Sequence, residues 1–66
     1  MGVVGLRFEE FLGKLIQVTY NNQDRQLRII GDLTKVDEKF ITVQTLSQTI
    51  YINVDEIITL QPARKE

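Results

Sequence analysis

The sequence predicts a mainly β protein in which a short N-terminal helix is followed by a strongly bent, five-stranded antiparallel small barrel. Three observations lead to this prediction. Apolar residues recur at three- and four-residue steps only near the N-terminus, and the period changes to two from Lys14 onward. Turn-forming residues divide the alternating part into five short segments. Gly31 interrupts the longest segment, which is typical of a strand that bends or closely approaches another backbone.

The helix is predicted over about residues 4–12. Its apolar face consists of Val4, Phe8, Phe11 and Leu12. Gly13 is placed to end the helix in a left-handed C-terminal cap.

Five strands are predicted from the two-residue alternation and the turns between them. They cover about residues 14–20, 25–36, 40–45, 49–53 and 57–60. Asn and Asp residues favour a turn at 21–24, and residues 54–56 are short enough for a tight turn or a 3₁₀ step. The barrel therefore extends over about residues 14–60 of a single domain, 1–66, and the tail at 61–66 is expected to fray.

The barrel interior is expected to hold one apolar side chain from each inward position. These residues are Leu12, Ile16, Val18, Leu27, Ile29, Leu33, Val36, Phe40, Val43, Ile50, Ile52, Ile57 and Leu60. At this chain length folding removes only about 60% of the unfolded chain's surface from water, so self-association is an economical way to supplement the core.

Composition argues against an enzyme. The chain has no Cys and no His, which excludes disulfides, thiolate sites, imidazole-ligated zinc and a histidine general base. The neighbouring carboxylates Asp55 and Glu56 are expected to be solvated on a turn rather than paired for chemistry. No catalytic residue, cofactor or metal site is therefore predicted.

Charge and hydropathy limit the partners. Eight basic residues against nine acidic ones create no field that would attract nucleic acid without specificity, so any RNA contact must be local. Arg7 and Glu9 interrupt the apolar start far short of the ~20 residues that a membrane span requires. A cytoplasmic protein with no membrane association is predicted.

The order of these elements and two short motifs resemble the Sm-like family. The first motif is matched by Gly31, Leu33, Asp37 and Phe40, and the second by Ile52, Asp55 and Ile57. The resemblance covers nearly the whole chain, from the helix to Leu60. It implies a cyclic homo-oligomer of about five to seven subunits, in which the fourth strand of one subunit pairs with the fifth strand of the next. It also implies single-stranded RNA as a ligand.

In the family, the loop after the aspartate and the loop after the fourth strand together form a uridine pocket. The resemblance places the family's stacking residue on Lys39 and its arginine on Asn53, while Asp37 and Asp55 keep their type. These four are the candidate RNA-binding residues. The family's asparagine falls on Ile41, which cannot bind a base edge, and losing such a contact costs about 1–3 kcal/mol. An altered nucleotide preference is therefore expected.

Alternative interpretations stay open for the function and for single residues. The second function class is a non-catalytic structural or protein-interaction barrel of the Src-homology type, with no nucleic-acid role. Asp37 can simply accept backbone N–H bonds in its own turn. Tyr20 and Tyr51 are interpreted as half-buried sheet residues, with base stacking as the alternative.

Overall fold

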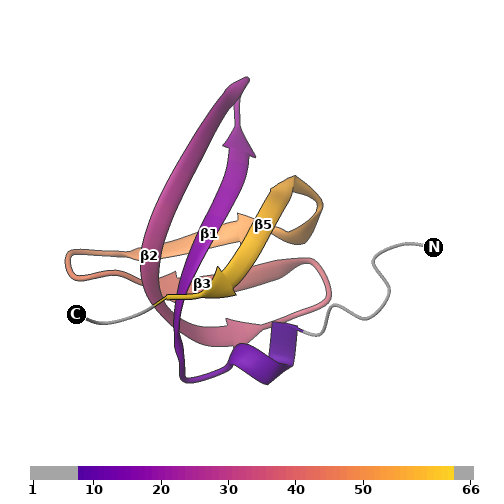
Figure 1. Ribbon diagram of the computed structural model, residues 1–66. Helices are drawn as coiled ribbons and strands as arrows, with labels where there is room; N and C mark the ends of the chain where they lie inside the picture. The colour runs from indigo at the N-terminus through magenta and orange to yellow at the C-terminus, as the bar shows by residue number, and fades with distance from the viewer. Residues whose placement is uncertain (1–7, 64–66) are drawn as a thin grey trace.

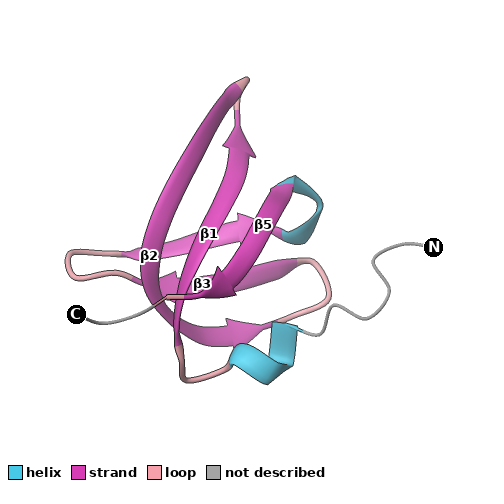
Figure 2. Cartoon of the chain, viewed as in Figure 1, coloured by secondary structure: helices cyan, strands magenta, loops and turns pink. Residues whose placement is uncertain are grey.

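The computed structural model of the protein describes residues 8–63, and strands account for most of them (Figures 1 and 2). In chain order the elements are η1 (Phe8–Phe11), β1 (Leu15–Asn22), β2 (Arg25–Val36), β3 (Phe40–Gln44), β4 (Thr49–Asn53), η2 (Val54–Glu56) and β5 (Ile57–Pro62). The two η elements are short 3₁₀ turns. The prediction of a mainly β protein with five strands is confirmed.

All five strands belong to one antiparallel sheet with the order β4-β3-β2-β1-β5. Strands β4 and β5 form the two edges of this sheet and are not paired with each other. The single chain therefore forms an open, curved sheet rather than a closed barrel.

Strand β2 bends so that it serves both halves of the sheet. Its first part pairs with β1, where Arg25 lies opposite Asn22 and Asp32 lies opposite Leu15. Its last part pairs with β3, where Asp32 lies opposite Gln44 and Val36 lies opposite Ile41. As a result the β3–β4 hairpin runs across the direction of β1 and β5 (Figure 1). A shift in the β2–β3 register between Leu33 and Lys35 adds to this bend, as β-bulges generally do.

Gly31 lies where β2 changes partner, and it is buried. A Cβ atom at this position would lie 2.5 Å from the carbonyl oxygen of Gln44 and 2.9 Å from Val43 Cγ1. The bend predicted at Gly31 is confirmed. The glycine is required because only a residue without a side chain lets the end of β3 pass this close.

Only part of the predicted N-terminal helix lies within the described residues. Residues 4–7 of the predicted helix lie outside the described residues, and the remainder forms the 3₁₀ turn η1 rather than an α-helix. Side chains three residues apart share one face of a 3₁₀ turn, so Phe8 and Phe11 both pack against the core. Gly13 follows with φ of 82°, the left-handed conformation that was predicted for it.

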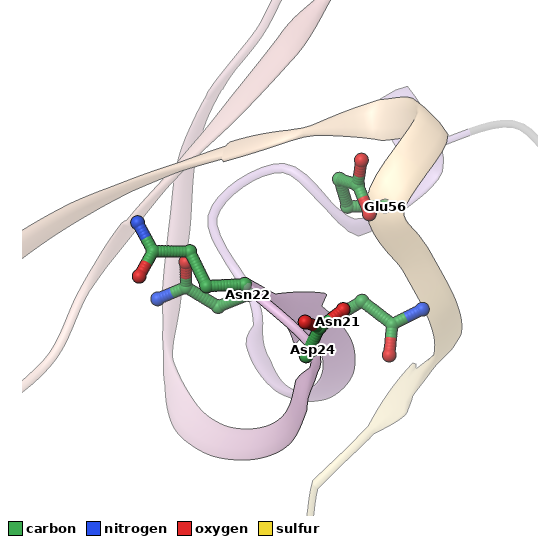
Figure 3. A pocket seen from close by; sticks show the side chains of 5 residues that line it. Asn21, Asn22, Asp24 and Glu56 are labelled. Carbon is green, nitrogen blue, oxygen red and sulfur yellow. The ribbon is translucent and has the colours of Figure 1, made fainter.

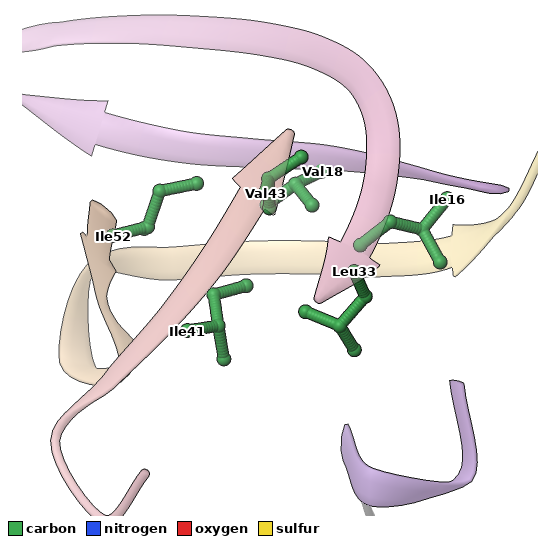
Figure 4. Packing of buried hydrophobic residues seen from close by; sticks show 6 residues of the cluster. All are labelled: Ile16, Val18, Leu33, Ile41, Val43 and Ile52. Atoms are coloured by element: carbon green, nitrogen blue, oxygen red, sulfur yellow. The ribbon is translucent and has the colours of Figure 1, made fainter. Parts of the chain in front are cut away.

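Six buried side chains from four strands form the core. They are Ile16, Val18, Leu33, Ile41, Val43 and Ile52. Figure 4 shows them gathered between the strands, and β5 adds only the half-buried Ile57 and Leu60. Ile29, Val36 and Ile50, which were predicted to fill the interior, are half-buried and pack at the margin of this cluster.

Three predicted core residues are wrong. Phe40 is 45% exposed, because Ile41 and Val43 face inward on β3 and the alternation puts Phe40 on the outer face. Leu12 is 44% exposed because it follows the 3₁₀ turn, outside the shared face of that turn. Leu27 lies near the far end of the β1–β2 hairpin and is not packed against the core cluster.

The turns refine the predicted strand ends. Strand β1 continues to Asn22, so the first turn contains only Gln23 and Asp24, with φ of 51° and 67°. Strand β5 continues to Pro62, and Ala63 N donates to Leu15 O at 2.9 Å. None of the helices among residues 8–63 is long and apolar enough to cross a membrane.

Candidate nucleic-acid interface

The fold brings the two predicted RNA-binding loops together. Val54 N donates to Lys39 O at 2.8 Å, and the neighbouring residues Phe40 and Asn53 are partners in the β3–β4 ladder. The turn that precedes β3 and the 3₁₀ turn η2 that follows β4 therefore lie at the same end of the β3–β4 hairpin. The four candidate residues share this end.

The first loop is a tight turn with exposed polar side chains. Asp37 N donates to Phe40 O at 2.8 Å, which closes the turn, and Asp37, Glu38 and Lys39 are exposed. Among the hydrogen bonds formed within residues 8–63, none has the Asp37 carboxylate as acceptor. The alternative in which that carboxylate holds its own turn is thus wrong, because the backbone bond does so.

In the second loop, Asn53 caps η2. Its side-chain Oδ1 accepts a hydrogen bond from Asp55 N at 2.8 Å, and its backbone is extended, with φ of −69° and ψ of 131°. This bond fixes the direction of the amide while leaving its NH₂ group, a double donor, for a ligand. Asp55 and Glu56 are both exposed on the turn, as predicted.

Ile41, at the position of the family's asparagine, belongs to the core rather than to the site. Its side chain is fully buried with Val43 and Ile52. Val54, which directly follows Asn53, is half-buried and packs against the same core. Neither Ile41 nor Val54 therefore offers a polar side-chain group to a ligand at this end, whereas Lys39 and Asn53 do.

Sequence reasoning missed an exposed aromatic residue beside the first loop. Phe40 lines one shallow pocket with Asp37, Glu38 and Lys39. It also lines a second pocket, on the outer face of the sheet, with Lys35 and Tyr51. Strict alternation from Val43 would have placed Phe40 on the outer face, so the signal was present in the sequence.

A second polar pocket lies at the β1–β2 turn, beside η2. It is lined by Asn21, Asn22, Gln23, Asp24 and Glu56. In Figure 3 the side chains of Asn21 and Asn22 extend to opposite sides of the hairpin, as expected of adjacent strand residues. The polar groups thus do not converge on a single point.

The described residues offer no metal centre. Within 8–63 there is no group of three or more His, Cys, Asp or Glu side chains that could hold an ion. The chemistry available at the candidate interface is hydrogen bonding, charge and stacking.

Comparisons with protein-family models, with curated proteins and with solved structures find no match for this chain.

Proposed function

We propose that the chain is the subunit of an Sm-like ring that binds single-stranded RNA at the paired loops around Lys39 and Asn53. The observation that carries the proposal is the hydrogen bond between Val54 N and Lys39 O, since it holds the two loops as one surface. Each subunit then contributes one ammonium group and one oriented amide from these loops, for a phosphate and a base edge respectively.

The strand order supports assembly. With β4 and β5 at opposite edges, each subunit offers two unpaired edges of similar length, five and six residues. Pairing β5 of one subunit with β4 of the next is a heterologous contact, and such contacts close into rings when the rotation allows it. Ring closure would also remove the exposed edges that a lone sheet leaves open to aggregation.

The charge balance makes the ring necessary for affinity. Two cations near the interface, Lys35 and Lys39, are outnumbered by four carboxylates, Asp37, Glu38, Asp55 and Glu56. A single subunit therefore gains little from phosphate contacts, whereas repetition around a ring multiplies a weak local contact.

Fluorescence anisotropy with short uridine-rich and adenine-rich RNAs tests the proposal. We expect Lys39→Ala and Asn53→Ala each to weaken binding by about 1–3 kcal/mol, the usual value of a specific polar contact to a nucleic acid. Both residues lie outside the buried core, so the oligomer should keep its mass on a sizing column with light scattering.

The control is Lys14→Ala, which removes an exposed cation from the segment before β1. Binding that survives both loop substitutions, or falls equally in the control, would move the site away from the paired loops. The second candidate, a protein-interaction module, is favoured by the slightly acidic net charge of −1 and gains support if the purified protein carries no RNA and binds none.

A further inference from the structure

We infer that Phe40 and Tyr51 form a stacking surface for the bases of the same single-stranded RNA. This aromatic face, Phe40 and Tyr51 with Lys35 and Thr42 beside them, lies on the outer side of β3 and β4. The inference rests on the proposed function and extends it, because it adds residues that would stack on the bases, while the paired loops hold a phosphate and a base edge.

The register places the two rings next to each other. Phe40 pairs with Asn53 and Thr42 pairs with Tyr51, so Phe40 and Tyr51 are diagonal neighbours on one face. Such neighbours lie about 7–8 Å apart, within reach of aromatic side chains. One ring is 45% exposed and the other 69% exposed, so both present area to solvent.

Folding does not account for these aromatic residues. The inner face of β3 and β4 already supplies the core through Ile41, Val43 and Ile52. Phe40 and Tyr51, by contrast, are both exposed. Two adjacent aromatic side chains exposed on one face of a sheet offer a platform on which bases can stack.

The aromatic face is continuous with the paired loops. Phe40 shares a pocket with Lys39, and it also shares one with Tyr51 and Asn53. Lys35 lines the pocket that contains both rings. A strand of RNA bound at Lys39 would therefore have Phe40 in the same pocket, with Lys35 lining the adjoining one.

Stacking, rather than charge, would carry this part of the affinity. Asp37 lines the pocket of Lys35 as well as that of Lys39, which reduces the positive potential at both. Stacking on aromatic side chains contributes to single-strand binding whatever the base, because every base has a π-face. Exposed aromatic residues on neighbouring strands of a sheet are also how some RNA-binding domains hold two or three bases.

A proline-rich peptide fits the face less well. Peptides in the polyproline II conformation dock in grooves lined by aromatic side chains. Here only two rings line the pocket, and lysine and threonine side chains make up much of its rim. We therefore assign the face to RNA.

The test compares RNA with a ribose-phosphate oligomer that carries no bases, both six nucleotides long and fluorescently labelled. We expect Phe40→Leu and Tyr51→Leu each to weaken binding of hexauridine and hexaadenosine roughly 5- to 150-fold, the equivalent of about 1–3 kcal/mol per stacked base. Binding of the base-free oligomer should not change. Leu46→Ala, which removes an exposed apolar side chain from the opposite end of the hairpin, is the matched control and should bind like the wild type.

Tyrosine fluorescence gives a direct second readout, because the chain has two Tyr and no Trp. Tyr20 packs against the core, so Tyr20→Phe leaves Tyr51 as the single emitter. RNA should quench this emission, and the base-free oligomer should not.

The possible outcomes separate the two proposals. Unchanged RNA affinity in both leucine variants, or unquenched Tyr51, overturns the aromatic face, and the proposed function stands if Lys39→Ala and Asn53→Ala still weaken binding. A wild-type protein that binds no RNA overturns both. A smaller oligomer in the leucine variants would assign the face to subunit contact, and binding of a proline-rich peptide in place of RNA would assign it to a protein partner. Either result overturns the inference.

Discussion

At the scale of single residues, Leu33 joins the two halves of the bent sheet. Its side chain is fully buried, its N–H donates to Lys14 O at 3.1 Å and its carbonyl accepts from Gly13 N at 2.8 Å. We expect Leu33→Ala to lower the free energy of unfolding by about 2–5 kcal/mol, because the cavity has little room to collapse. Phe40→Ala, on the outer face, should cost less than about 1 kcal/mol. Urea denaturation at one protein concentration measures both, and equal losses would contradict the assigned faces of β2 and β3.

Gly31 gives a second prediction at this scale. We expect Gly31→Ala to destabilise the fold by about 1–3 kcal/mol, because the added methyl group meets the backbone of Gln44, which cannot rotate away as a side chain would. Asp32→Ala, at the exposed neighbouring position, is the control and should stay within about 0.5 kcal/mol of the wild type. A thermal midpoint that is the same for Gly31→Ala and the wild type would show that the end of β3 can move away.

Alternation predicted most of the core but not the face of every strand. Ile16, Val18, Leu33, Val43 and Ile52 were all placed correctly. On β3, however, Phe40 and Val43 were both expected inside, although residues three apart in a strand lie on opposite faces. The size and apolarity of Phe40 favoured the interior, whereas the pairing of β3 with two neighbouring strands fixes Ile41 there instead.

At the scale of elements, the turn of the β1–β2 hairpin has a backbone conformation that is strained for its two residues. Gln23 and Asp24 both have positive φ in a two-residue loop, a conformation that favours Asn-Gly. We expect Gln23→Asn combined with Asp24→Gly to raise the free energy of unfolding by about 0.5–1 kcal/mol. The double variant relieves the strain of the left-handed backbone, and the conformational entropy that glycine adds to the unfolded chain offsets part of this gain. Thermal denaturation measures the change. Gln23→Val should lower stability, and a double variant no more stable than the wild type would contradict this account of the turn.

Element types were easier to predict than element geometry. The strands follow from alternation over four or more residues, and each appears within two residues of its expected ends. The helix was ambiguous because Phe8 and Phe11 are three residues apart, a spacing that fits both a 3₁₀ turn and an α-helix. The bend of β2 was predictable because Gly31 has few other roles inside a strand.

At the scale of the whole molecule, the sequence predicted which loops meet but not everything that lies beside them. Lys39 and Asn53 come together because one hairpin joins their loops, and that hairpin was predicted with nearly correct ends. The aromatic face was missed because it depends on which side of β3 is buried. Alternation from Val43 indicates that side, but the size and apolarity of Phe40 pointed to the interior.

The free edges of the sheet give a prediction about assembly. Ile58 lies on edge strand β5, in a β-bulge. Thr59 lies opposite Thr19 and Ile57 lies opposite Tyr20, so Ile58 has no partner residue on β1. Its side chain is 47% exposed, so a lysine there should leave the single subunit folded. A charge buried between two subunit edges, by contrast, is costly without a partner. We therefore expect Ile58→Lys to convert a ring of about five to seven subunits into smaller species.

The matched control is Ile30→Lys, which places the same charge at a similarly exposed position, 52%, on the central strand β2. Light scattering on a sizing column should give the wild-type mass for Ile30→Lys and a lower mass for Ile58→Lys, with the same circular dichroism for both. A wild-type protein that stays monomeric at tens of micromolar would reject the ring itself. An intact oligomer in Ile58→Lys with a broken one in Ile30→Lys would place the subunit contact on the outer face of β2, and edge pairing through β5 would then be wrong.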